Sequence, residues 1–113
     1  MTDKIVILVT CGSRREAKKI ARHLVESKLS ACVNVSSPVA SIYRWKGKIQ
    51  DDREYLLLIK TRRELFPKVE AAVRALHSYT TPEVIALQIV EGAQDYLQWI
   101  DESVEPRASG AKP

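Results

Sequence analysis

With 113 residues, of which 45% are hydrophobic and 28% charged, the chain is long enough for one domain with a hydrophobic core and has the composition of a soluble protein. No apolar run approaches the roughly 20 residues of a membrane-spanning helix, and the short run Ile5–Val9 lacks the flanks of a signal peptide, so we expect a cytoplasmic protein with no membrane partner. The net charge of +4 comes from scattered basic residues, mostly interleaved with acids, which argues against a nucleic-acid partner.

The sequence contains two cysteines, Cys11 and Cys32, and no CxxC pair. This pattern argues against a structural zinc site and against thioredoxin-like redox chemistry. In a reducing cytoplasm we expect both residues to be free thiols.

The N-terminal segment predicts a strand followed by a helix. Ile5–Val9 is a continuous apolar run of the kind found in strands that are buried on both faces. Ser13 and Glu16 form a capping-box pattern at the start of a helix over 14–27. Apolar residues then recur at helical spacing and form one buried stripe. These residues are Ala17, Ile20, Ala21, Leu24 and Val25.

A long β-hairpin is predicted next. Strand character covers 31–35, is interrupted at Pro38, resumes over 39–45 and returns over 54–61 after a turn at Gly47. Arms of about 14 residues would reach roughly 46 Å, whereas helices of about 15 residues reach roughly 22 Å. The hairpin should therefore extend beyond its own domain, and its aromatic tip invites pairing with another copy of the chain.

A second helix is predicted to end near His77. Thr61 and Glu64 form another capping-box pattern, but Pro67 lies too far into such a helix for its first turn. Either a short turn precedes the main helix, or the helix is kinked at the proline.

The C-terminal segment predicts a strand over 84–90 and a short helix over 96–104. The order β, α, β-hairpin, α, β indicates a ferredoxin-like βαββαβ sandwich, an α+β fold with a long β2–β3 hairpin and an added C-terminal helix. We expect one domain over residues 1–105 and a disordered tail over 106–113.

Several segments, taken together, closely resemble the signature of the CutA family. These are Leu29–Asn34, Ser41–Ile49 with Glu54 and Leu58–Thr61, His77–Ile85, and Tyr96–Ile100. The resemblance extends from about Ile5 to Val104. It implies a ferredoxin-like fold, a tight homotrimer similar to the PII signalling proteins, and a role in tolerance of divalent cations, copper above all.

The resemblance also implies a metal site for copper or another divalent cation. Cys11 occupies the position of the family's copper-binding cysteine, and His77 matches a histidine of its metal site, with Glu83 as a third candidate ligand. A thiolate is a soft ligand suited to copper(I). Leu76 stands where the copper-binding form has an adjacent histidine, which removes one ligand. The alternative interpretations are a buried, inert Cys11 and a His77 that caps its helix.

A second hypothesis is a PII-like sensor or interaction module that binds a small ligand or a partner protein at the clefts between subunits. Its candidate residues are the aromatic and charged members of the signature, namely Tyr43, Trp45, Glu54, Lys60 and Tyr79. We predict a pocket near Lys60, His77, Tyr79 and Glu83. The alternatives are interface packing for Tyr43 and Trp45, and a cross-strand or inter-subunit ion pair for Glu54 and Lys60.

The sequence does not indicate an enzyme. It contains no Gly-rich phosphate loop, no HExxH pattern and no nucleophile elbow. The aliphatic segment 55–59 lacks the aromatic residues of the RNA-binding module with this topology, and segment 11–15 only faintly resembles the acylphosphatase loop.

Overall fold

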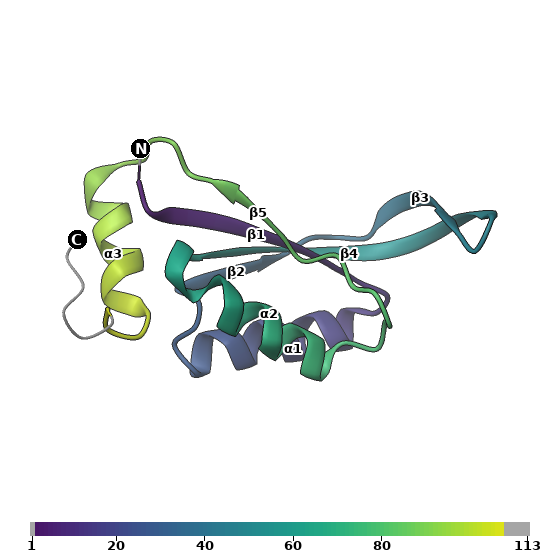
Figure 1. The fold of residues 1–113 in the computed structure, drawn as a ribbon, viewed down its shortest axis with the longest axis horizontal. Helices are drawn as coiled ribbons and strands as arrows, with labels where there is room; N and C mark the ends of the chain where they lie inside the picture. The colour runs from purple at the N-terminus through teal and green to yellow at the C-terminus, as the bar shows by residue number, and fades with distance from the viewer. Residues whose placement is uncertain (1, 108–113) are drawn as a thin grey trace.

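The computed structural model describes residues 2–107. Figure 1 shows an antiparallel sheet with α1 and α2 on one face, α3 at one end and a hairpin that extends past the other end. The molecule is elongated, with principal extents of 48 × 26 × 24 Å. Within residues 2–107, no helix is both long and apolar enough to cross a membrane.

The sheet has the ferredoxin-like strand order that the sequence predicts. β1 (Lys4–Cys11) lies in the centre and pairs with β4 (Lys48–Arg62) and β5 (Ile85–Gln88). β2 (Cys32–Val35) pairs with the C-terminal part of β4, and β3 (Val39–Trp45) pairs with its N-terminal part. One hairpin arm is thus broken between β2 and β3, as the proline in this gap predicts, while β4 is continuous over 15 residues.

Only one face of this sheet is covered within residues 2–107, although the sequence predicts a first strand buried on both faces. Ile5, Ile7 and Val9 are buried beneath the helices. The opposite face, which we call the open sheet face, carries apolar side chains that are half-buried or exposed. These are Val6, Leu8, Leu56, Leu58, Ile85 and Leu87. A row of apolar side chains without a covering layer is a candidate interface.

Helix α1 (Arg14–Glu26) begins as predicted, with the Ser13 hydroxyl accepting a hydrogen bond from the Glu16 N–H at 3.1 Å. The second half of the predicted capping box is missing, because the Glu16 side chain turns toward His77. The predicted stripe is buried apart from Val25, which is 42% exposed.

Helix α2 (Phe66–Leu76) follows a short 3-10 turn over Arg63–Leu65, so the first of the two alternatives for Pro67 is correct. Pro67 lies in the first turn of α2, where a missing N–H costs nothing. The predicted capping box of Thr61 and Glu64 is wrong. The Thr61 hydroxyl donates to the Leu29 carbonyl at 2.7 Å, and Glu64 accepts from Arg62 at 2.7 Å.

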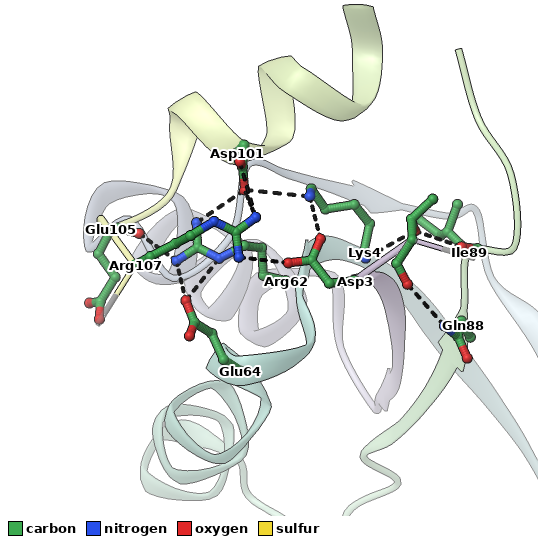
Figure 2. A network of polar contacts seen from close by, with 10 residues as sticks. Asp3, Lys4, Arg62, Glu64, Gln88, Ile89, Asp101, Glu105 and Arg107 are labelled. Atoms are coloured by element: carbon green, nitrogen blue, oxygen red, sulfur yellow. Dashed lines mark hydrogen bonds and ion pairs between the residues drawn. The ribbon is translucent and has the colours of Figure 1, made fainter. Parts of the chain in front are cut away.

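The end of the sheet that contacts α3 (Gln94–Ser103) is held by the polar network in Figure 2. The Arg62 side chain is 1% exposed and donates to Glu64 and to the Glu105 carbonyl, both at 2.7 Å. Arg107 pairs with Asp3 at 2.8 Å and with Asp101 at 3.0 Å. The first residues of the predicted tail are therefore tied to the domain, and residues 108–113 lie outside the described residues.

Candidate functional site

His77 ends α2 and places its imidazole against the end of β1. The residue is the C-cap of the helix, with extended backbone angles (φ −82°, ψ 142°), so the chain turns there toward the sheet. The side chain is fully buried, with Nε2 at 2.7 Å from the Thr10 carbonyl. Because a carbonyl only accepts, Nε2 carries the proton, and Nδ1 accepts the Tyr79 N–H at 3.0 Å. These two contacts fix a neutral imidazole of one tautomer.

Three ligand-type side chains converge at this point, and we call them the Cys11–Glu16–His77 cluster. Cys11 ends β1, Glu16 lies in the first turn of α1, and His77 ends α2. Their sulfur, oxygen and nitrogen atoms all lie within 4.8 Å of one another. The structure thus brings together the two metal ligands that the family resemblance implies, and it adds Glu16. Glu83, the third candidate in the sequence, is not part of this group.

The Glu16 carboxylate is the unusual member of the cluster. Its Oε2 atom is buried, lies 3.5 Å from His77 Nδ1 and has no hydrogen-bond partner among the described residues. Since Nδ1 already accepts the Tyr79 N–H, it has no proton to offer this oxygen. An unpaired buried carboxylate oxygen costs about 1–3 kcal/mol or more, so the site favours the approach of a cation.

Burial, together with the nearby charges of Glu16 and Glu54, raises the pKa of the Cys11 thiol to about 12. In the metal-free protein the thiol is therefore protonated at neutral pH. A metal ion would reverse this preference, because its charge stabilises the thiolate. Sulfur, imidazole nitrogen and a carboxylate oxygen form a donor set that suits copper or zinc.

A concave site of about 640 Å³ lies next to the cluster, and we call it the hairpin pocket. It is formed by the base and outer part of the hairpin, the end of β1 and the loop over 78–83. Its lining residues are Thr10, Ser41, Ile42, Tyr43, Trp45, Glu54, Ser78, Tyr79, Thr80, Thr81 and Glu83. The lining combines three aromatic rings with two carboxylates and includes no lysine or arginine.

Tyr79 connects the pocket with the cluster. Its N–H is bound to His77, and its hydroxyl donates to Glu54 Oε2 at 2.7 Å. Gly12 leaves room for this arrangement, because a Cβ atom at Gly12 would lie 3.1 Å from the Tyr79 hydroxyl oxygen. Burial and the hydrogen bond to Glu54 raise the pKa of Tyr79, so the phenol remains a donor.

The other titratable groups of the hairpin pocket are also acidic or bound to acids, and the remaining serine and threonine side chains are neutral. Tyr43 donates to Asp52 at 2.5 Å, and this bond raises the pKa of Tyr43. Burial and the charge of Glu54 raise the pKa of Glu83. Glu54 is only 5% exposed. The pocket is therefore electronegative.

Of the predicted pocket residues, Tyr43, Trp45, Glu54, Tyr79 and Glu83 line one site, whereas Lys60 lies elsewhere. The Lys60 ammonium donates to Asn34, on the neighbouring β2. The reason is the return path of α2, which carries the chain about 16 Å back along the sheet. The loop after α2 therefore lies beside Glu54, and Lys60 is about 20 Å further along β4.

The sequence reasoning missed Glu16, which it assigned to a capping box. A signal was present, since Glu16 follows Cys11 across a single strand-to-helix turn. Only the position of α2 above α1 shows that the Glu16 carboxylate points at His77.

Residues 5–103 match the family described as CutA1 divalent ion tolerance protein. The divalent-cation tolerance protein CutA of Thermus thermophilus is 49% identical over 98 residues, which are 87% of this chain and 95% of that protein. Protein CutA of Homo sapiens is 47% identical over 97 residues, and this chain matches 54% of its length.

Solved structures are equally similar. The divalent cation tolerance protein of Thermus thermophilus has a TM-score of 0.88 at 47% identity and covers 90% of this chain and 99% of its own. CutA of Xylella fastidiosa has a TM-score of 0.89 at 38% identity and covers 92% of this chain and 100% of its own.

Proposed function

The chain belongs to the CutA1 family of divalent-ion tolerance proteins, and we propose that it is a homotrimer that binds metal ions, copper above all, through the Cys11–Glu16–His77 cluster. The observation that carries this proposal is the buried Glu16 oxygen, which lacks a partner beside a thiol and an imidazole. A bound cation supplies that partner. Copper(I) favours the soft sulfur of Cys11, and the imidazole of His77 accepts copper in either oxidation state.

Binding requires changes in proton and hydrogen-bond positions. The Cys11 thiol loses its proton, and a metal at His77 Nδ1 replaces the hydrogen bond from Tyr79. Acidification therefore weakens binding, since protons compete for the thiolate and the imidazole. With Leu76 in place of the family's second histidine, the affinity is lower than that of a site with both.

The test is calorimetric titration with copper(I), under anaerobic conditions, and with copper(II). We expect Cys11→Ser, Glu16→Gln and His77→Ala each to weaken binding. The chain offers matched controls, because Cys32→Ser and His23→Ala change its other cysteine and its other histidine. Unchanged binding in all three cluster variants would exclude this site, and no binding by the wild type would exclude the function.

Two features support the homotrimer. The open sheet face is apolar, and the hairpin extends beyond the domain with Ile42 at 70% and Ile49 at 61% exposure. An interface that covers such side chains removes apolar area from water, which stabilises by about 25 cal/mol per Å². Static light scattering tests the assembly state, and a monomer at micromolar concentration contradicts it.

The hairpin pocket favours a second candidate function, a PII-like module that binds a small ligand or a partner protein. Its volume of about 640 Å³ falls within the usual range of ligand sites, and its polar groups converge on one space. Side-by-side titrations with copper and with small organic ligands, nucleotides among them, separate the two functions. Neither function includes catalysis, and the absence of acetyl phosphate hydrolysis is the corresponding check.

The cytoplasm is the compartment that fits these functions best. Cys11 and Cys32 are free thiols in the structure, as a reducing compartment keeps them. Fractionation of cells that express the tagged protein tests the compartment, and recovery outside the cytoplasm contradicts it.

A further inference from the structure

We propose that the hairpin pocket binds a small organic cation, with its ammonium group held by Glu54 and Glu83 beside the rings of Tyr43, Trp45 and Tyr79. This inference names the ligand class for the second candidate function above and rests on that function. It does not require a metal ion in the Cys11–Glu16–His77 cluster, which Tyr79 joins to the pocket.

The first argument is an unbalanced charge. Glu54 is 5% exposed, and the one hydrogen bond that its carboxylate makes within the described chain comes from the Tyr79 hydroxyl, which is neutral. None of the ion pairs among residues 2–107 involves Glu54 or Glu83. A nearly buried carboxylate without a cation is costly, and a ligand cation in the pocket removes that cost.

The second carboxylate reinforces the first. Glu83 lines the same pocket from the loop after α2. Partial burial and the charge of Glu54 raise the pKa of Glu83. A cation bound beside both carboxylates offsets the repulsion between them and stabilises the charged form of Glu83. The lack of lysine and arginine in the lining disfavours anions such as nucleotides.

The third argument separates an organic cation from a metal ion. Three aromatic residues line the pocket, and aromatic faces attract ammonium groups, with tryptophan the strongest. In the described chain, only the Cys11–Glu16–His77 cluster brings three ligand-type atoms within 4.8 Å. Glu54 and Glu83 therefore lack the third ligand of a metal site, while the pocket volume of about 640 Å³ accommodates an organic molecule.

The arrangement is also held in place before a ligand arrives. Tyr79 is fixed at both ends, by His77 and by Glu54, and Tyr43 is fixed by its bond to Asp52. Rings that are already oriented lose little conformational entropy on binding.

The test compares choline with its uncharged carbon isostere, dimethylbutanol, by calorimetry on the full chain. The NMR signal of the Trp45 indole N–H reports whether the ligand enters the pocket. We expect saturable binding of choline and binding of the isostere that is weaker by about tenfold or more. Glu54→Gln and Glu83→Gln should each weaken choline binding by about tenfold without affecting the isostere.

Matched variants control for folding and for charge elsewhere. Glu54→Gln keeps an acceptor for the Tyr79 hydroxyl, and Glu26→Gln makes the same change on the exposed end of α1 and should leave choline binding unaltered. Trp45→Leu keeps an apolar side chain on the hairpin, and light scattering shows whether its assembly state is unchanged. In that case it should weaken choline more than the isostere, which separates a cation–aromatic contact from simple apolar packing.

Each other outcome overturns the inference in a recognisable way. If the isostere binds as tightly as choline, the pocket is an apolar site. If a nucleotide shifts the Trp45 signal and choline does not, the ligand class is wrong but the pocket function survives. If copper displaces choline in a Cys11→Ser background, the pocket is itself a metal site. If no probe binds up to about 10 mM, well above millimolar dissociation constants, both the ligand class and the pocket function fail.

Discussion

Two residues, Glu16 and Tyr79, determine how the site works at the scale of single side chains. Glu16 contributes a buried oxygen without a partner. Tyr79 joins the cluster to the hairpin pocket through its N–H and its hydroxyl. A ligand in one site therefore changes a hydrogen bond that the other site uses.

Replacing Glu16 by glutamine should stabilise the metal-free protein by about 1 kcal/mol, because it removes a buried charge that has no partner. The unpaired oxygen costs about 1–3 kcal/mol, and the lost attraction between Glu16 and the start of α1 offsets about 0.3–1 kcal/mol of the gain, which leaves about 1 kcal/mol. Urea unfolding in the presence of a chelator measures the difference, with Glu26→Gln as the control. A destabilised Glu16→Gln variant would show that the carboxylate is already satisfied.

The raised pKa of Cys11 predicts selective thiol chemistry. At pH 8, iodoacetamide should label Cys32 and leave Cys11 unmodified in the folded, metal-free protein, because Cys11 is buried and its pKa lies near 12. Mass spectrometry of peptides identifies the labelled residue, and urea-unfolded protein should be labelled at both. Rapid labelling of Cys11 in the folded state contradicts the burial.

The raised pKa of Cys11 also determines how the stability of the folded protein changes with pH. The thiol pKa is raised in the folded state above the 9.0 of an exposed thiol. The folded state therefore holds its proton more tightly. The stability that this provides is full below pH 9.0 and is lost as the pH rises toward about 12.

At the scale of elements, α3 is attached to the sheet by charge as much as by apolar contact. Among the residues of α3, all of which the structure describes, only Ile100 is buried. The neighbouring Asp101 pairs with Lys4, Arg62 and Arg107. Figure 2 shows how these side chains converge between the ends of β1, β4 and α3.

At low pH, α3 should be held less firmly against the sheet, because the ion pairs of Asp3 and Asp101 are lost. Burial raises the pKa of Asp101 and of Asp3, but Lys4 and Arg107 outweigh burial and lower both below 3.8. Their contribution to stability is present above pH 3.8 and is lost as the pH falls through their lowered values.

We expect Asp101→Asn to be less stable than the wild type at pH 7 by about 1 kcal/mol, because it loses charge-assisted hydrogen bonds. The difference should shrink as the pH falls below 3.8. Thermal unfolding across pH measures it, and Asp95→Asn, in the exposed first turn of α3, is the control. A constant difference across this range would contradict the ion pairs.

At the scale of the whole molecule, the described residues carry two exposed apolar surfaces, the open sheet face and the hairpin. The helices cover one sheet face, and the open sheet face and the hairpin project away from them (Figure 1). Both surfaces have the character of an interface, which is why the homotrimer is part of the proposed function.

Trp45→Asp should weaken assembly and make the unfolding temperature depend more strongly on protein concentration, since it places a charge on an exposed apolar residue of the hairpin. Light scattering measures the assembly state, and thermal unfolding at a series of protein concentrations measures the change in unfolding temperature. Val25→Asp is the matched control, because Val25 is a similarly exposed apolar residue, 42% against 45%, on the helical side. Equal effects of both variants would mean that the hairpin is not the interface.

The order of elements could be predicted from the sequence alone, because it depends on local patterns. The apolar run of β1, the stripe of α1 and the break at Pro38 are each determined by neighbours along the chain. The choice of Cys11 and His77 as candidate metal ligands could also be made from the sequence, because its long motifs resemble those of the family. The strand order and fold class followed from that element order.

The tertiary structure decided which side chains meet. The length of α2 places the loop over 78–83 beside Glu54 and leaves Lys60 outside the pocket, and the packing of α2 on α1 turns Glu16 toward His77. The Thr61 hydroxyl, which the sequence predicts to cap a helix, instead donates to the Leu29 carbonyl, 32 positions away in the chain. Sequence patterns report the period of an element and its local caps. The meeting of distant side chains depends on helix lengths and packing distances, which only the folded chain sets.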